Sequence, residues 1–159
     1  MLYYIIDGYN LINSLPLLKN KSSLEEKRRS LINLISKYKL TGSPHNKVMI
    51  VFDGKDEFTR FQKVFDFEVV FTNNKEKADD FIIKKVEESK NPRIIIVVSD
   101  DRELCFKVKR RRALTLSVKD FFAPLFRKDE KRVPDKFMLS PKQIKMINQE
   151  LKRLWLRED

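Results

Sequence analysis

Continuous runs of apolar, β-branched residues most constrain how this chain of 159 residues can fold. The runs Val48–Phe52 and Ile94–Val98 are rich in valine and isoleucine and contain no polar residue. Strands covered on both faces, as in a parallel sheet between helices, have this pattern, whereas half-exposed strands alternate apolar and polar residues. The two runs therefore predict buried strands of a parallel sheet. Shorter apolar runs predict further strands at Leu2–Ile6, Glu68–Phe71 and Leu114–Ser117.

Helical patterns alternate with these predicted strands. Ser23 precedes Glu26 by three residues, and this capping box predicts a helix whose apolar positions include Leu31 and Ile35. Because helices alternate with strands, we expect right-handed crossovers and a three-layer α/β domain with a mostly parallel central sheet. Further helices are predicted over Ala78–Glu88, from a cap at Asp100 to about Lys109, and from a cap at Ser117 into Phe121–Phe126.

The domain is expected to cover residues 1–126. Residues 127–139 carry many charges without a helical or strand period, which predicts a linker. An amphipathic helix is then predicted over residues 140–159, because Ser140 supplies a cap and a proline and a glutamine follow in the first turn. We expect this C-terminal helix to pack on the domain, and contact with a partner molecule is the alternative. Its apolar stripe consists of Ile144, Ile147, Leu151 and Leu154.

Aspartates follow three of the predicted strands. Asp7 follows the first, Asp53 follows the second, and the pair Asp100 and Asp101 follows the run that ends at Val98. In open α/β sheets, ligands bind outside the carboxyl ends of the strands, so these side chains are expected at one edge of the sheet. More carboxylate is predicted at the start of a helix, at Asp79 and Asp80.

Several carboxylates at one edge repel each other unless protons or a cation neutralise them. Oxygen ligands alone suit Mg²⁺ or Mn²⁺, which keep several waters and also bind substrate phosphate. Such ions activate water and stabilise the leaving oxygen of a phosphodiester. Each aspartate also has a purely structural explanation, because Asp-Gly after a strand is often a turn and Asp100 can simply cap a helix. The strand ends taken together favour a metal site.

The chain carries a net charge of +11, from 34 basic and 23 acidic residues. Such an excess is typical of a protein that binds a polyanion, because each lysine or arginine beside a phosphate releases counterions. A lysine-rich surface without a specific partner is the alternative. An acidic cluster in an otherwise basic chain fits a nuclease, in which the positive surface holds the strand and the acidic pocket holds the metal.

The densest basic cluster lies at the predicted C-terminus of the helix that begins near Asp100. We expect it to bind RNA phosphates. A structural role is the alternative, because basic side chains also stabilise the negative end of a helix dipole. The members of the cluster are Lys107, Lys109, Arg110, Arg111 and Arg112.

Other site chemistries have little support in the sequence. His45 is the one histidine, so a histidine pair or a zinc cluster is not available. No glycine-rich loop matches a phosphate-binding loop or a dinucleotide fingerprint, so we expect no nucleotide cofactor. Cys105 is the one cysteine and lies in an apolar helical stretch, which fits a buried thiol in a reducing cytoplasm. No apolar run approaches the ~20 residues that cross a bilayer, so we expect no membrane partner.

Four ordered motifs resemble those of the YacP-like branch of the NYN domains, which belong to the PIN-like nucleases. The motifs are YYIIDGYNLI, VMIVFDG, FTNNKEKADDFIIKKVEES and IIIVVSDDREL. The resemblance covers about residues 2–126, and the ordered set is much more specific than any single motif. It implies a PIN-like fold.

The resemblance also implies an activity, namely endonucleolytic cleavage of RNA with Mg²⁺ or Mn²⁺, in some members on messenger RNA at the ribosome. Aligned with the family's Thr-Ser-Asp-Arg-Glu-Leu form, Asp101 is the site aspartate and Asp100 takes the place of the serine. Asn10, Asp80 and Asp100 are supporting polar residues. A non-catalytic RNA- or ribosome-binding module and a PIN-like DNA flap nuclease are the alternatives. The implied metal ligands are Asp7, Asp53, Asp79 and Asp101.

Overall fold

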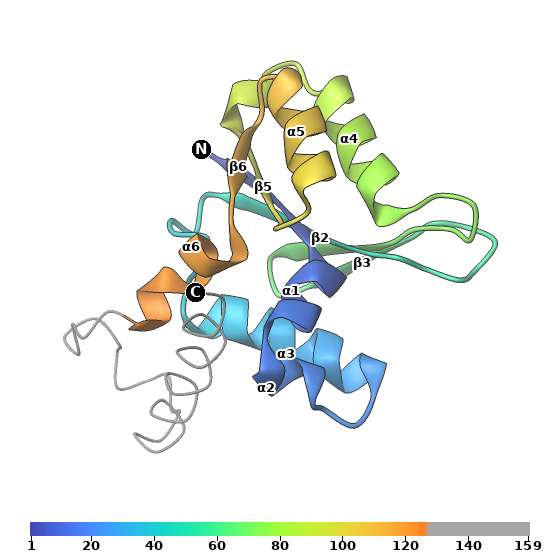
Figure 1. The fold of residues 1–159 in the computed structure, drawn as a ribbon, viewed down its shortest axis with the longest axis vertical. Helices are drawn as coiled ribbons and strands as arrows, with labels where there is room; N and C mark the ends of the chain where they lie inside the picture. The colour runs from blue at the N-terminus through green and yellow to red at the C-terminus, as the bar shows by residue number, and fades with distance from the viewer. Residues whose placement is uncertain (127–159) are drawn as a thin grey trace.

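A six-stranded sheet forms the centre of the computed structural model, which describes residues 1–126 (Figure 1). The strand order is β3-β4-β2-β1-β5-β6, and every neighbouring pair is parallel except β3 and β4, which are antiparallel. The predicted, mostly parallel sheet is therefore confirmed. The strands are β1 (Tyr3–Asp7), β2 (Lys47–Phe52), β3 (Arg60–Val64), β4 (Phe67–Phe71), β5 (Ile95–Val98) and β6 (Leu114–Leu116).

Helices cover both faces of the sheet, so the fold has the three layers predicted from the sequence (Figure 1). Helices α1, α2, α3 and α6 pack against one face, and α4 and α5 pack against the other. Successive strand residues alternate between the two layers, which is why the central strands are apolar throughout. The helices are α1 (Gly8–Ser14), α2 (Pro16–Lys19), α3 (Leu24–Lys37), α4 (Ala78–Glu88), α5 (Arg102–Arg110) and α6 (Val118–Phe122), with short 3-10 helices at Pro92–Ile94 and Ala123–Phe126.

Serine side chains begin two of the helices as predicted. The hydroxyl of Ser23 accepts a hydrogen bond of 3.1 Å from the backbone N–H of Glu26 at the start of α3. The hydroxyl of Ser117 accepts one of the same length from the backbone N–H of Asp120 at the start of α6. Each bond satisfies one of the backbone donors that the first turn of a helix leaves without an intrahelical partner.

The predicted cap of α5 at Asp100 is wrong by one residue. Asp101 is the N-cap, and its Oδ1 accepts hydrogen bonds of 3.0 and 3.2 Å from the backbone N–H groups of Glu103 and Leu104. Asp100 instead accepts a bond of 2.9 Å from the backbone N–H of Val118, at the beginning of α6. Adjacent aspartates fit the same spacing rule, and only the path of the chain after β5 decides which of them caps the helix.

Strand β3 and helices α1 and α2 were not predicted. Strand β3 lies at the edge of the sheet with most of its residues exposed, so it has no apolar run. The turn to β4 consists of Phe65 and Asp66 and lacks the glycine or asparagine that usually marks a hairpin, although Phe65 has a φ of 55°. Helix α1 begins at Gly8, directly after β1, where an Asp-Gly pair by itself indicates a turn.

Two predictions fall on the C-terminal part of the chain. The linker at residues 127–139 and the helix at residues 140–159 lie outside the described residues. In the described part, residues 1–126, we find no helix with the length and apolar character needed to span a lipid bilayer.

Candidate active site

Four aspartates gather at the carboxyl edge of the sheet. Asp7 is the last residue of β1, and Asp53 directly follows β2. Strand β1 pairs with both β2 and β5, so the three strand ends are adjacent. Asp101 caps α5 just after β5, and Asp79 lies in the first turn of α4. The tertiary structure therefore brings together all four of the aspartates that the motifs single out.

Asp7 is the most buried of the four, with 8 % of its surface exposed. Its pKa is raised to about 6, first because burial removes water from the carboxylate and then because Asp79 and Asp53 are negative neighbours. Hydrogen bonds from the Ser99 hydroxyl, at 3.2 Å, and from the backbone of Asn10 lower the pKa in part. The charge of Asp7 is thus only partly balanced by the protein.

Asp79, in the first turn of α4, lies within hydrogen-bonding reach of Asp101, the N-cap residue of the neighbouring helix α5. The pKa of Asp79 is raised to about 6 by partial burial first and then by the charge of Asp101, by the hydrogen bond with Asp101, and by Asp53 and Asp80. Two carboxyl groups can share a hydrogen bond only when one of them is protonated. This edge of the sheet therefore holds more negative charge than the surrounding protein neutralises.

Asp53 connects the end of β2 to the beginning of α4. Its Oδ1 accepts a hydrogen bond of 2.7 Å from the backbone N–H of Ala78, the first residue of α4. The N-cap residue of this helix, Lys77, makes no side-chain cap, so Asp53 supplies the oxygen from 25 positions away. This bond also holds Asp79, the next residue along α4, beside the strand ends.

The glycines that follow the first two strand-end aspartates, Gly8 and Gly54, are required by close packing. A Cβ atom on Gly8 would lie 2.2 Å from the Phe52 ring, and one on Gly54 would lie 1.9 Å from the carbonyl oxygen of Thr72. Neither glycine has a positive φ, so a left-handed turn is not the reason for them. The Asp-Gly pairs allow the strand ends to approach their neighbours closely, and this brings the aspartates together.

The three predicted supporting residues have different surroundings. The side-chain oxygen of Asn10 accepts a hydrogen bond of 2.9 Å from the backbone N–H of Asp100, so Asn10 holds the loop between β5 and α5 against α1. Asp100 holds the same loop against α6 through its bond to Val118. Asp80 is exposed and adds negative charge near Asp79.

Sequence reasoning missed Ser99, which is almost fully buried. Its hydroxyl donates to Asp7 and accepts a hydrogen bond of 3.1 Å from the backbone N–H of Asp101. The signal that could have identified it is its position, between an apolar strand and a pair of aspartates. Nearby, the half-buried thiol of Cys105 donates to the carbonyl oxygen of Ser99 at 3.4 Å, and burial raises the pKa of this thiol.

The predicted RNA-binding cluster lies at the end of α5 away from Asp101. Helix α5 has 9 residues. At a rise of ~1.5 Å per residue, the cluster is therefore roughly 13 Å from the acidic edge along the helix axis. It can contact only a part of a substrate that extends away from the acidic group.

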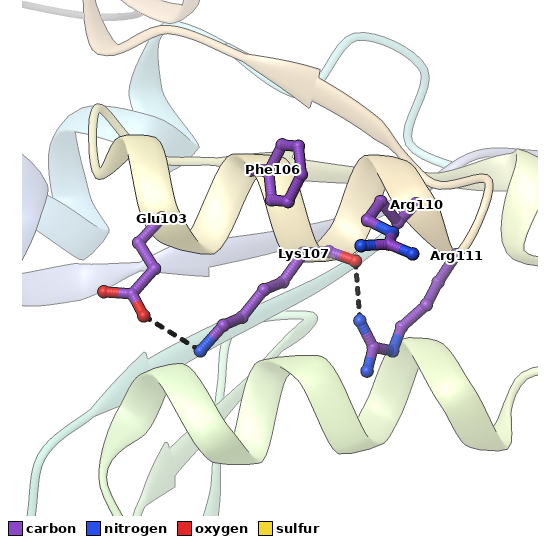
Figure 2. A pocket seen from close by; sticks show the side chains of 5 residues that line it. All are labelled: Glu103, Phe106, Lys107, Arg110 and Arg111. Carbon is purple, nitrogen blue, oxygen red and sulfur yellow. Dashed lines mark hydrogen bonds and ion pairs between the residues drawn. The ribbon is translucent and has the colours of Figure 1, made fainter.

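Some side chains of this basic cluster already form hydrogen bonds or ion pairs within the protein, as Figure 2 shows. Lys107 pairs with Glu103 at 3.1 Å, and Arg111 donates to the carbonyl oxygen of Lys107 at 2.8 Å. Arg111 also pairs with Glu87 of α4 at 2.6 Å. Arg110 lies over the exposed ring of Phe106, and Lys109 and Arg112 are exposed.

The carboxylates at the edge of the sheet supply oxygen atoms, which are the ligands that a hard divalent cation prefers. Within residues 1–126, no group of three or more acidic, histidine or cysteine side chains is arranged so that it could hold a metal ion by itself. Mg²⁺ usually keeps several waters and takes only one or two carboxylates from the protein. An open set of oxygen donors with surplus negative charge fits an ion of this kind.

Comparison with known proteins shows sequence relatives along most of the chain. The family model described as the YacP-like NYN domain matches residues 4–157, which includes a C-terminal part that the four motifs do not reach. The Bacillus subtilis (strain 168) protein described as uncharacterized protein YacP is 35 % identical over 106 residues, which are 62 % of this chain. The match spans 61 % of the length of that relative.

Two crystal structures of Rae1 (YacP) from Bacillus subtilis have a similar fold. A tryptophan-to-leucine mutant has a TM-score of 0.62 and 23 % sequence identity, with 99 % of both chains covered. A second structure has a TM-score of 0.59 and 21 % identity, with 99 % of this chain and 81 % of the other covered. The three-layer arrangement is therefore the PIN-like fold expected from the motifs. Because the family model matches nearly the whole length of this chain, the chain belongs to the YacP-like NYN domain family.

Proposed function

We propose that the protein is a metal-dependent endoribonuclease that hydrolyses RNA phosphodiester bonds at the carboxyl edge of its sheet. Membership in the YacP-like NYN domain family implies a nuclease-like function on RNA. The observation that carries the finer proposal is the surplus of negative charge, because Asp7 and Asp79 both have a pKa raised to about 6 by burial and by their acidic neighbours. A cluster that served packing alone would gain nothing from this repulsion.

Mg²⁺ or Mn²⁺ would be held by Asp7, Asp53, Asp79 and Asp101 in this proposal. A bound ion of this kind neutralises phosphate charge and lowers the pKa of water. The substrate phosphate would be favoured separately, because the N-termini of α4 and α5 are both directed to this edge. Their partial positive charge favours a phosphate group.

The other polar residues keep the proposed ligands in position. Ser99 holds the carboxylate of Asp7 and the backbone of Asp101, while Asn10 holds the loop that carries Asp101. Burial raises the pKa of Asp7 to about 6 in the metal-free protein, so protons compete with the ion for this carboxylate, and activity is expected to fall as the pH is lowered.

RNA in the cytoplasm is the proposed substrate, and messenger RNA at the ribosome is the context that the motif resemblance implies. The net charge of +11 supports contact with a polyanion. Lys109, Arg110 and Arg112 are exposed at the basic end of α5, and in this proposal they would bind RNA phosphates at a distance from the acidic edge.

The direct test incubates the protein with end-labelled single-stranded RNA and with DNA of the same sequence, in Mn²⁺, in Mg²⁺ or in chelator. We expect internal cuts in RNA that need the divalent ion and that disappear in Asp7→Asn and Asp101→Asn. Asp66→Asn is the matched control, because it removes the same charge from an exposed residue of the β3–β4 turn. It should cleave like the wild type.

Each rival function has its own result in this assay. RNA binding without cleavage under any ion would favour a non-catalytic RNA- or ribosome-binding module. Preferential cutting of a branched DNA flap would favour the flap nuclease. Cleavage that survives chelator, or that survives both aspartate changes, would overturn the proposed site.

A further inference from the structure

A cluster of arginine and aromatic side chains lies on the α3 side of the same sheet edge. The guanidinium carbons of Arg28 and Arg60 lie 5.1 and 5.2 Å from the centre of the Phe71 ring. The Phe71 ring stacks at 5.6 Å on Phe52, and Arg28 donates a hydrogen bond of 2.9 Å to the hydroxyl of Tyr9. Aromatic contacts of this kind hold a guanidinium in a fixed orientation while its N–H groups remain able to bind an anion.

The strand register places this cluster beside the acidic edge. Phe71 is the last residue of β4 and pairs with Phe52, and Phe52 directly precedes Asp53. Consecutive Cα atoms are ~3.8 Å apart. Tyr9 follows Asp7 by two residues in the chain. Phe52 and Phe71 pack on the α1–α3 layer, whereas Asp79 and Asp101 come from the helices of the other layer.

The positive charges of Arg28 and Arg60 indicate that this cluster binds an anion. Within residues 1–126, no carboxylate forms an ion pair with Arg28, which is half-buried. Arg60 pairs with Asp56, but both side chains are largely exposed, and such pairs contribute little. Two like charges over one ring repel each other, and a phosphate between or beside them relieves that repulsion. A hollow lined by Arg60, Phe61, Gln62 and Phe71 leaves this surface open.

The basic end of α5 is less suited to hold the strand next to the reacting phosphate. It lies a helix length from Asp101, and Lys107 and Arg111 are already paired with glutamates. Arg28 and Arg60 instead lie at the same edge as Asp53. A strand that crosses this edge from the acidic group toward α3 meets them directly.

We propose that Arg28 and Arg60, oriented by Phe71, bind the backbone phosphate of single-stranded RNA next to the acidic group. The inference rests on the proposed function and adds the direction in which the bound RNA strand extends from the acidic group. Arginine suits this role because its planar fork binds phosphate oxygens in pairs. In this arrangement the strand runs over the carboxyl ends of β2 and β4.

The test measures the affinity for a short labelled single-stranded RNA in chelator, where no cleavage can occur. Arg28→Gln and Arg60→Gln should each weaken binding ~10-fold, the size expected for one lost charge-assisted hydrogen bond. The slope of log K against log salt should fall by roughly 0.7 for each lost phosphate contact. Arg28→Lys keeps the charge but loses the planar fork, so it should retain the salt slope and recover only part of the affinity.

Matched controls lie on the same elements. Arg29 follows Arg28 in α3, is exposed, and pairs with Glu25. Lys63 lies exposed on β3, three residues beyond Arg60. Arg29→Gln and Lys63→Gln remove the same charge and should leave the affinity close to that of the wild type. Thermal melts of all variants show whether any loss of binding comes from loss of folding.

The outcomes separate this inference from the proposed function. If the wild type binds RNA through Arg28 and Arg60 but cuts no RNA in Mn²⁺, the proposed function fails and the binding site stands. If RNA is cut but Arg28→Gln binds no worse than Arg29→Gln, the inference is overturned and the proposed function stands. Absence of measurable RNA binding by the folded wild type would also overturn the inference.

Discussion

The hydroxyl of Ser99 lies 3.2 Å from Oδ2 of Asp7, although the two residues are 92 positions apart in the chain. The same hydroxyl accepts a hydrogen bond from the backbone N–H of Asp101. One buried serine thus joins the end of β1 to the N-terminus of α5, and it sets the relative position of two proposed metal ligands.

Ser99→Ala is expected to shift the pH dependence of RNA cleavage. It removes a hydrogen bond that lowers the pKa of Asp7, so that pKa should rise further and the acid limb of the rate profile should move to higher pH. Loss of a hydrogen bond to a charged group should also reduce the free energy of unfolding by about 1–3 kcal/mol. Ser99→Thr keeps the hydroxyl and is the control. Identical profiles in the alanine and threonine variants would contradict this role.

The stability of the metal-free protein should depend on pH in an unusual direction. Asp7 and Asp79 have pKa values of about 6 in the folded protein, against the ordinary value of 3.8. Between these values the folded protein binds more protons than the unfolded chain, so the free energy of unfolding falls as the pH rises. In chelator, the melting temperature should be higher near about pH 5 than near about pH 7.

Addition of Mg²⁺ or Mn²⁺ at neutral pH should reverse that loss, because an ion that binds only the folded state stabilises it by mass action. Asp79→Asn should weaken both the pH dependence and the effect of the ion. Calorimetry would measure the binding directly. A melting temperature that is insensitive to millimolar divalent ion would count against the metal site.

Asp101 and Asp100 should respond differently to substitution. Asn is also a good N-cap, so Asp101→Asn should keep the fold while removing the charge that a hard cation needs, and cleavage should be lost. Asp101→Ala should in addition destabilise the protein by about 1 kcal/mol through loss of the α5 cap. Asp100→Ala loses its bond to Val118 but should retain cleavage. Loss of cleavage in Asp100→Ala alone would show that Asp100 is the ligand.

Gly54→Ala should damage both the fold and the site. The new methyl group would meet the backbone carbonyl of Thr72, which cannot move as a side chain can, so a destabilisation of about 1–3 kcal/mol is expected, with reduced cleavage because Asp53 is displaced. Gly42→Ala is the control, since a Cβ on Gly42 would make only an ordinary contact of 3.5 Å with the Asn46 side chain, although the φ of Gly42 is +75°. It should cost about 1 kcal/mol without affecting cleavage. Thermal melts and the cleavage assay compare the two.

Two pairs of basic residues at the end of α5 should differ in how much they contribute to RNA binding. Changing Arg110 and Arg112 together to Gln should weaken RNA binding for all sequences and flatten its salt dependence. Changing Lys107 and Arg111 should affect RNA binding less, because both are already paired with glutamates. A salt slope unchanged in the first variant would leave this cluster with only the role of stabilising the helix end.

The positions of the main strands, and the aspartates that follow them, could be predicted from the sequence alone. Val48–Phe52 could be assigned because a strand buried on both faces must be apolar throughout, and the parallel direction then brings Asp7 and Asp53 to one edge. The four motifs identified Asp79 and Asp101 by resemblance. The exposed strand β3 was missed because no buried face marks it in the sequence.

The contacts that connect these residues depend instead on the packing of the folded protein. The choice of Asp101 as the cap of α5, the bridge through Ser99, and the meeting of Arg28 and Arg60 at Phe71 all depend on contacts that local spacing does not encode. Local rules describe hydrogen bonds within a turn or a helix face. The site is formed instead by the packing of layers, which sets the distances between side chains far apart in the chain and thereby their charges and pKa values.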